Sequence, residues 1–256
     1  MRDRLEEVGI VIEDGNESGW RGKIVEGVNA LEAALNSNRV KKVIVLDTKL
    51  NKSNKFNFLI EGIKKQNIEI EIVKDNKLWE FHSRHNIVGI CEEKEIFDEK
   101  NFENIISEKI LILDHFQDTN NLGAVARSAA AFDFQTIFLP KKRSVQITDK
   151  TFAISSGGME YVNIVMYNSI FSLIKKIKNL GYWTIGLDMN SSNQIKDLDL
   201  KNQNIALIVG SEETGLSKEI QKKLDLIVNI SMTNNMESLN ASVASAIAMH
   251  EIFIKK

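Results

Sequence analysis

Apolar and polar positions follow two alternating patterns along the chain. Compact apolar runs, typical of buried strands, are followed by stretches in which apolar residues recur at the spacing of a helix. Before residue 94 the predicted strands are 40–46, 68–73 and 87–91, and the predicted helices are 27–35, 54–66 and 75–81. Later in the chain the predicted strands are 109–113, 136–140, 162–167, 182–188, 205–210 and 225–230. This alternation predicts an α/β fold with helices on both faces of a mostly parallel sheet.

The stretch EEKEIFDEKNFENIISEK, residues 92–109, interrupts this pattern because it is highly charged and weakly periodic. We therefore expect a small α/β domain at 23–93, a linker at 94–108 and a larger domain at 109–256. Residues 1–22 show no clear period and are left unassigned.

The stretch DTNNLGAVARSAAAF, residues 118–132, predicts a helix that begins at Asn121. Its apolar stripe faces the core and consists of Leu122, Val125, Ala126, Ala129 and Phe132. Arg127 falls on the opposite side among small residues, where an ordinary solvent-exposed face carries Lys and Glu. The pattern indicates either an exposed arginine on an alanine-rich helix or a cation with space beside it for a ligand.

Two later stretches place glycines and polar residues at the ends of predicted strands. In IVGSEETGL, residues 208–216, glycine at position 210 allows a ligand to approach the backbone, while Glu212 fits either a site or a solvated acidic turn. In NISMTNNMESLNASVA, residues 229–244, Ser238 or Asn240 opens an apolar helix and fits helix capping. That last helix, 238–254, is apolar or small nearly all round, so its own domain or a second copy of the chain encloses it.

Composition and charge narrow the classes of protein. The net charge of −2 over 256 residues neither supports nor excludes nucleic-acid binding, and the tight cluster Lys141-Lys142-Arg143 fits either a solvated loop or a phosphate contact. A single cysteine, Cys91, excludes an internal disulfide framework and fits a reducing cytoplasm. The scattered histidines predict no metal site. No apolar run has the length of a membrane span and the charged N-terminus predicts no export signal, so we expect a cytoplasmic protein.

The three motif stretches, in this order and at these distances, resemble the signature motifs of the SpoU (TrmH-like) family of RNA ribose 2′-O-methyltransferases, in the SPOUT superfamily. Residues 141–164 resemble the family's linker after the first motif, and residues 24–35 and 84–90 resemble its N-terminal RNA-binding domain. The combination is most like bacterial enzymes that methylate a guanosine ribose of 23S rRNA. The resemblance implies a trefoil-knotted SPOUT domain, S-adenosylmethionine as methyl donor, RNA as partner, a homodimer and no metal.

The resemblance also assigns roles to individual positions. It implies a catalytic set that consists of Asn121, Arg127, Glu212, Ser238 and Asn240. It implies methyl-donor contacts at Leu139, Gly210, Ile230, Met232 and Leu239. Arginine is a poor proton acceptor at neutral pH. Our hypothesis is therefore that Arg127 holds the phosphate beside the reacting ribose, and that Glu212 orients Arg127 or accepts the proton.

This chain departs from the family pattern at three positions. Thr119 and Ser231 stand where the first and third motifs usually have proline, which removes a turn-fixing residue and leaves the chemistry intact. Asn86 stands where the N-terminal domain usually has Gln-Gly, so the exact RNA substrate stays open. The alternatives are a tRNA ribose methyltransferase and a non-catalytic RNA-binding member of the fold. A Rossmann-type methyltransferase is disfavoured because no Gly-x-Gly-x-x-Gly turn is present.

Overall fold

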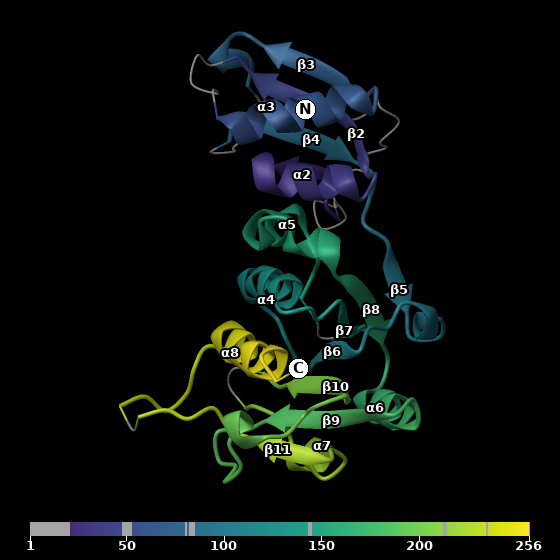
Figure 1. The fold of residues 1–256 in the computed structure, drawn as a ribbon, viewed down its shortest axis with the longest axis vertical. Helices are drawn as coiled ribbons and strands as arrows, with labels where there is room; N and C mark the ends of the chain where they lie inside the picture. The colour runs from purple at the N-terminus through teal and green to yellow at the C-terminus, as the bar shows by residue number, and fades with distance from the viewer. Residues whose placement is uncertain are drawn as a thin grey trace. The chain divides into compact units, whose positions relative to one another are not determined.

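The computed structural model describes residues 21–47, 53–79, 81, 85–142, 145–211, 214–233 and 235–255. The chain forms two compact units (Figure 1). One contains the described residues up to Lys94 together with Ile147–Glu160, and the other contains Glu95–Gln146 and the residues from Tyr161 onward. No helix in the described part of the chain is long and apolar enough to span a membrane.

The first unit is built on a four-stranded mixed sheet in the order β1-β4-β2-β3. Its strands are β1 (Ile24–Glu26), β2 (Val40–Leu46), β3 (Glu69–Val73) and β4 (Ile87–Cys91), and its two longer helices are α2 (Val28–Asn36) and α3 (Asn54–Lys65). Strand β2 runs antiparallel to β4 and parallel to β3. The predicted strands and the first two predicted helices of this region are therefore present, with small shifts at their ends.

The helix predicted at 75–81 is wrong. Among the described residues of this range, only a single 3-10 turn, η2 (Asn76–Leu78), forms. The Asp75 side chain accepts a hydrogen bond from the backbone N–H of Lys77 at 2.9 Å, and Trp79 is already extended. A local bond of this kind satisfies the backbone without a helix, which explains why the apolar spacing misled.

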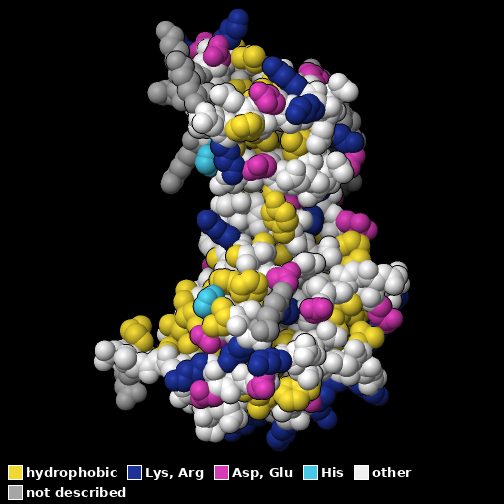
Figure 2. Space-filling view, viewed as in Figure 1, with side chains coloured by type: hydrophobic (Ala, Val, Ile, Leu, Met, Phe, Trp, Pro, Cys, Tyr) yellow, Lys and Arg dark blue, Asp and Glu magenta, His cyan; other side chains and the backbone are white. Residues whose placement is uncertain are grey.

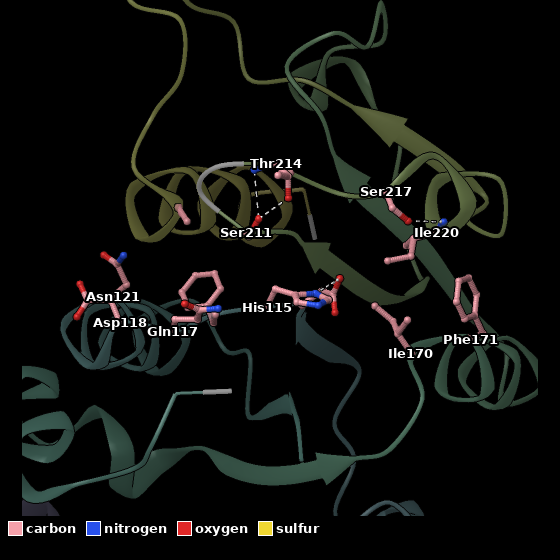
Figure 3. A pocket seen from close by; sticks show the side chains of 14 residues that line it. His115, Gln117, Asp118, Asn121, Ile170, Phe171, Ser211, Thr214, Ser217 and Ile220 are labelled. Carbon is pink, nitrogen blue, oxygen red and sulfur yellow. Dashed lines mark hydrogen bonds and ion pairs between the residues drawn. The ribbon is translucent and has the colours of Figure 1, made fainter. Parts of the chain in front are cut away.

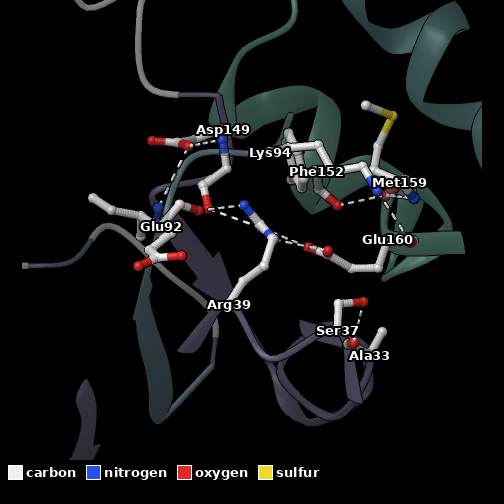
Figure 4. A network of polar contacts seen from close by, with 12 residues as sticks. Ala33, Ser37, Arg39, Glu92, Lys94, Asp149, Phe152, Met159 and Glu160 are labelled. Carbon is white, nitrogen blue, oxygen red and sulfur yellow. Dashed lines mark hydrogen bonds and ion pairs between the residues drawn. The ribbon is translucent and has the colours of Figure 1, made fainter. Parts of the chain in front are cut away.

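Residues 147–160 belong to the first unit, although the sequence pattern placed them in the larger domain. They form α5 (Asp149–Ser155) and the start of the 3-10 helix η4 (Gly158–Tyr161). The buried Arg39 guanidinium donates to both carboxylate oxygens of Glu160, at 2.9 and 2.7 Å (Figure 4). Asp149 accepts from the backbone N–H of Gly22 at 3.0 Å, and burial raises the pKa of this carboxyl to about 7. These polar contacts attach the segment to its unit.

The second unit contains a seven-stranded parallel sheet in the order β11-β9-β10-β6-β7-β8-β5. Its strands are β5 (Ile96–Asp98), β6 (Lys109–Leu113), β7 (Thr136–Pro140), β8 (Asn163–Tyr167), β9 (Tyr182–Leu187), β10 (Asn204–Val209) and β11 (Leu226–Val228). Its helices include α4 (Thr119–Ala131), α6 (Ile170–Asn179), α7 (Lys218–Gln221) and α8 (Ala241–Phe253). Figure 1 shows α4 and α8 on one side of the sheet and α6 on the other, which confirms the predicted fold class.

The predicted linker, residues 94–108, belongs to this second unit from Glu95 onward. Strand β5 pairs with β8, and the wholly buried Phe102 packs edge-on against Phe138 with ring centroids 5.0 Å apart. The charges that suggested a linker are used in surface contacts, such as the ion pair of Glu103 with Lys176 at 3.1 Å. The apolar residues between these charges reach the core, and β5 is the edge strand of the sheet. The segment is therefore a packed part of the second unit.

Helices α4 and α8 pack against each other and bring two of the sequence motifs together. Helix α4 begins at Thr119, earlier than predicted, because the Asp118 side chain caps it by accepting from the N–H of Asn120 at 2.9 Å. The predicted core stripe is confirmed, since its members within the helix are completely buried. Helix α8 is capped by Asn240 and buries a single stripe made of Ala241, Ser245, Ala248, Met249 and Ile252.

Candidate active site

The loops after β6, β9, β10 and β11 meet at the carboxyl edge of the parallel sheet. The chain proceeds from β6 toward β7 and β8 on one side, while β9 and β10 lie on the other side of β6. The point between β6 and β10 where the strand order reverses is where open α/β sheets bind ligands. Two adjoining cavities lie at this edge.

The smaller cavity has a volume of about 200 Å³. It is lined by residues 187–190, 209–211, 214–215, 228–230, 232, 238–239, 241 and 244. Five residues that the sequence assigned to the site meet here, namely Gly210, Ile230, Met232, Ser238 and Leu239. Leu139 does not join them, because its side chain lies in β7 and is completely buried.

Gly210 and Gly215 lie close together in the wall of the smaller cavity. A Cβ atom on Gly210 would lie 2.2 Å from the backbone carbon and oxygen of Gly215, so no larger residue fits. The N–H of Gly215 donates to the carbonyl of Ser211 at 2.9 Å, and the hydroxyls of Ser211 and Thr214 are 2.7 Å apart. Gly210 and Gly215 therefore expose only backbone atoms to this cavity, beside the hydroxyls of Ser211 and Thr214.

Two polar residues of the smaller cavity were missed by the sequence reasoning. Asn229 Oδ1 is buried and has no hydrogen-bond partner among the described residues, while its Nδ2 donates to the carbonyl of Ser191 at 2.7 Å. Asp188, directly after β9, accepts from the backbone N–H of Asn190 at 2.8 Å and from the side chain of Gln221. Their signal in the sequence was a polar residue at the C-terminal end of a predicted strand, where parallel sheets place ligand contacts.

The larger cavity has a volume of about 660 Å³ (Figure 3). It is lined by residues 114–118, 121, 170–171, 211, 214–215, 217, 220 and 241. Of the predicted catalytic set, Asn121 lines it. Ser211, Thr214, Gly215 and Ala241 line both cavities, so a molecule in one lies beside a molecule in the other.

Asn121 and Asn240, from the first and third motifs, are in direct contact. The side-chain N–H of Asn240 donates to Oδ1 of Asn121 at 3.1 Å. The sequence assigned both to the catalytic set, and the fold brings them together at the N-terminal ends of α4 and α8.

An aspartate and a histidine of the larger cavity were also missed. Nδ1 of His115 lies 2.9 Å from Oδ2 of Asp114, and Asp114 is buried at the end of β6. The Tyr167 hydroxyl lies 3.1 Å from the carbonyl of Leu113 and 3.3 Å from Oδ1 of Asp114. Burial, followed by the neighbouring Asp114 carboxylate, raises the pKa of the Tyr167 phenol, which therefore stays protonated.

The remaining predicted residues lie elsewhere. Arg127 is exposed on α4 and lines neither cavity of its own chain. Glu212 and Arg143 lie outside the described residues. Lys141, from the basic cluster, forms an ion pair with Asp98 of β5. Within the described ranges, no three His, Cys, Asp or Glu side chains are grouped so that they could hold a metal ion.

Two family models match this chain. The model of the SpoU rRNA Methylase family matches residues 108–250, and a model for RNA 2′-O ribose methyltransferase substrate binding matches residues 24–96. A TrmH family tRNA/rRNA methyltransferase of Staphylococcus aureus strain COL is 27% identical over 242 residues, which cover 91% of this chain and 96% of that protein. A protein of the same name from Staphylococcus epidermidis is 26% identical over the same length.

Solved structures share the whole fold. A crystal structure of an RNA 2′-O ribose methyltransferase has a TM-score of 0.76 at 20% identity and covers 98% of this chain and 95% of its own. The SpoU methyltransferase AviRb from Streptomyces viridochromogenes, in complex with AdoMet, has a TM-score of 0.74 at 18% identity and covers 98% of both chains.

Together the fold, the carboxyl-edge cavities and these matches define an RNA ribose methyltransferase. The family model spans residues 108–250, more than half of the sequence. This chain belongs to the SpoU rRNA methylase family.

Proposed function

We propose that this protein transfers a methyl group from S-adenosylmethionine to the ribose 2′-hydroxyl of a guanosine in 23S rRNA, in the cytoplasm. The observation that carries the proposal is the pair of adjoining cavities with a shared wall of Ser211, Thr214, Gly215 and Ala241. One cavity holds the donor and the other the target nucleotide. Holding both reactants side by side lowers the barrier to direct methyl transfer, because they no longer have to meet and orient in solution.

The residues of the smaller cavity fit the methyl donor. The tight loop at Gly210 offers backbone groups, Ile230 and Leu239 offer apolar contact for a purine ring, and the unpartnered Asn229 Oδ1 is an acceptor for an amine. When bound there, S-adenosylmethionine supplies a methyl group attached to a positively charged sulfur. Ser238, from the third motif, adds a hydroxyl to the polar part of the wall of this cavity.

Arg127 acts on the RNA in this proposal. Its planar guanidinium holds the phosphate next to the reacting ribose, and Glu212 orients it. Because Arg127 lines neither cavity of its own chain, we assign it to the site of a second copy. A homodimer would then be required for methyl transfer.

The outward face of α8 supports that homodimer. Val243 and Ile254 are 46% and 57% exposed, and Ile247 on the same face is half-buried. These residues recur at the spacing of one helical face, opposite the stripe that packs inside the chain. An apolar face on the helix that opens with Asn240 would bring two active sites near one interface.

RNA contacts are proposed on both units. The first unit corresponds to the matched substrate-binding model and supplies the main affinity. In the second unit, a groove of about 590 Å³ carries Lys175, Lys178 and Lys223 and begins at Phe171, which also lines the larger cavity. Figure 2 shows dark-blue Lys and Arg side chains along the lower edge of this unit. Such a groove fits the phosphate backbone of a strand that leaves the larger cavity.

The test is to map ribose methylations in rRNA and tRNA after deletion of the gene. Loss of one 2′-O-methylguanosine in 23S rRNA, restored by the parent gene and not by an Arg127→Ala variant, is the expected result. Loss of a tRNA methylation instead would overturn the rRNA assignment. A purified protein that binds RNA but shows no calorimetric binding of S-adenosylmethionine would be a non-catalytic member of the fold.

A further inference from the structure

We propose that His115 is the proton acceptor for the ribose 2′-hydroxyl and that Asp114 positions it. This inference rests on the proposed function, because it concerns the same reaction. Neither residue belongs to the set that the family resemblance assigned. Both line the larger cavity, where the target nucleotide is placed.

The contacts of Asp114 determine which nitrogen of His115 is available. Nδ1 of His115 lies 2.9 Å from Oδ2 of Asp114, so the tautomer with its proton on Nδ1 places that proton beside the carboxylate oxygen. The neutral imidazole then has an unprotonated Nε2, which is a hydrogen-bond acceptor. Aspartate orients histidine in the same sense in hydrolytic triads.

Asp114 is itself held in place. Its Oδ1 lies 3.3 Å from the Tyr167 hydroxyl, which stays protonated because of burial, and its backbone N–H donates to the carbonyl of Val209 at 2.9 Å. The carboxylate is buried, whereas the side chain of His115 is 53% exposed toward the cavity (Figure 3). A buried carboxylate behind an accessible imidazole is the arrangement that a positioned base needs.

The backbone at His115 is in the left-handed region, with φ of +54°. This conformation is uncommon for residues other than glycine and costs of order 1 kcal/mol or more. Glycine would adopt it without that cost. Backbone strain of this kind clusters at functional sites, and His115 lies at the switch point of the sheet.

No other described side chain of the larger cavity has the same capacity. The charged or titratable groups that face His115 are Asp114, Asp118 and, behind Asp114, Tyr167. Asp118 accepts from the first turn of α4 as its cap. The remaining polar side chains are neutral amides and hydroxyls, namely Gln117, Asn121, Ser211, Thr214 and Ser217. Histidine is the residue that takes up and releases protons between about pH 5 and 8.

The proton and electrons balance without a further reactant. The 2′-hydroxyl proton moves to Nε2 of His115, and the oxygen keeps the electron pair that forms its bond to the methyl carbon. The pair of the broken carbon–sulfur bond stays on sulfur, which becomes neutral. The imidazolium then releases its proton to water, and Asp114 stabilises the charged ring in the interval.

The experiment compares single-turnover methyl transfer by the parent chain and a His115→Asn variant across pH 5 to 8. Asparagine tolerates the left-handed backbone and has no basic nitrogen. We expect the parent rate to rise with pH over this range, and the variant to be at least about 100-fold slower with no such rise. Asp133→Asn is the matched control, since Asp133 is another left-handed residue of the same unit, with φ of +62°.

A second readout does not depend on activity. In ¹⁵N spectra of histidine-labelled protein, with the His115 signal assigned from the variant, we expect Nδ1 to be protonated and Nε2 unprotonated. An Asp114→Asn substitution should shift this tautomer while S-adenosylmethionine binding is retained. A Nε2-protonated tautomer in the parent chain, or a His115→Asn rate close to the parent rate, would overturn the inference. Failure of the proposed function is distinguishable, because the parent chain would then methylate no ribose in rRNA or tRNA.

Discussion

The side-chain amide of Asn240 donates a hydrogen bond of 3.1 Å to Oδ1 of Asn121 across 119 positions of sequence. Hydrogen bonds on both sides fix the orientation of the Asn240 amide. Its Oδ1 accepts from the N–H groups of Ser242 at 2.9 Å and Val243 at 3.4 Å, so its Nδ2 is left to donate. One side chain therefore caps α8 and holds the first turn of α4 at the wall of the larger cavity.

This double role predicts different outcomes for two substitutions of Asn240. Asn240→Asp keeps the capping oxygen and should leave the free energy of unfolding nearly unchanged, but it removes the donor to Asn121 and places two acceptors together. We expect about a tenfold loss of methyl transfer. Asn240→Ala should lose the same activity and in addition about 1 kcal/mol of stability. Urea unfolding and a methyl-transfer assay check this, and an Asp variant with full activity would contradict it.

Substitutions of Gly210 and Gly215 should differ in their effects on S-adenosylmethionine binding and on stability. Gly210→Ala places a Cβ 2.2 Å from the backbone of Gly215, so the loop must move and calorimetric binding of S-adenosylmethionine should be lost. We also expect about 1–3 kcal/mol of destabilisation from overpacking. At Gly215 a Cβ meets no atom of the described residues within 4 Å, but φ is +62°. Gly215→Ala should therefore cost only about 1 kcal/mol of backbone strain and retain binding, and equal effects of the two variants would refute this explanation.

Asp149 predicts a dependence of the first unit's stability on pH. Burial raises the pKa of this carboxyl from 3.8 to about 7, so between these values the folded state holds a proton that the unfolded state has released. The stability contributed in acid is therefore lost as pH rises through this window, by up to about 4 kcal/mol. Urea unfolding at pH 5 and pH 8 spans about two units of this window, so it should show a loss of about 3 kcal/mol in the parent chain and a smaller one in Asp149→Asn. The same pH dependence in both would contradict it.

The boundary between the units predicts how truncations behave. A chain that begins at Ile110 lacks β5 and Phe102, which is completely buried in the core of the second unit. We expect it to aggregate, because the loss of a core phenylalanine alone costs about 3–5 kcal/mol. A chain that begins at Glu95 retains residues 147–160, which normally pack in the first unit, so Phe152→Ser is added to remove a buried apolar side chain that this chain would expose. This variant should fold, bind S-adenosylmethionine and lose most RNA affinity. Filter binding checks the last point, and unchanged RNA affinity would show that the first unit is dispensable for it.

The proposed dimer predicts the effect of a charge on α8. Ile247→Glu would bury an unpaired carboxylate in the interface and should cost several kcal/mol of association, giving a monomer or aggregate without methyl transfer although Arg127 is intact. Leu180→Glu is the control, because Leu180 is 38% exposed after α6 and away from this face. Light scattering measures the mass. An active monomer of the parent chain would refute the dimer.

The sequence by itself determined the elements whose pattern is local. Strands such as 40–46, 109–113 and 136–140 have the bounds that their apolar runs predicted. A mostly apolar run fits a strand whose two faces are both covered. It therefore forms a strand whichever strands lie beside it. The motif residues Gly210, Ser238 and Asn240 were also identified from the sequence, because turns, caps and glycines have local signals.

Only the tertiary structure decided features that depend on partners far away in the sequence. Residues 147–160 belong to the first unit because Glu160 is bound by Arg39. The two residues are more than a hundred positions apart, so no local pattern in the sequence reveals the contact. The family resemblance implied a methyl-donor contact at Leu139, yet the packing of β7 buries this side chain away from both cavities. His115 had no local signal at all. Its pairing with Asp114, and the support that Tyr167 gives to Asp114, exist only because parallel strands end at one edge, where burial and hydrogen bonding are set by neighbouring strands rather than by adjacent residues.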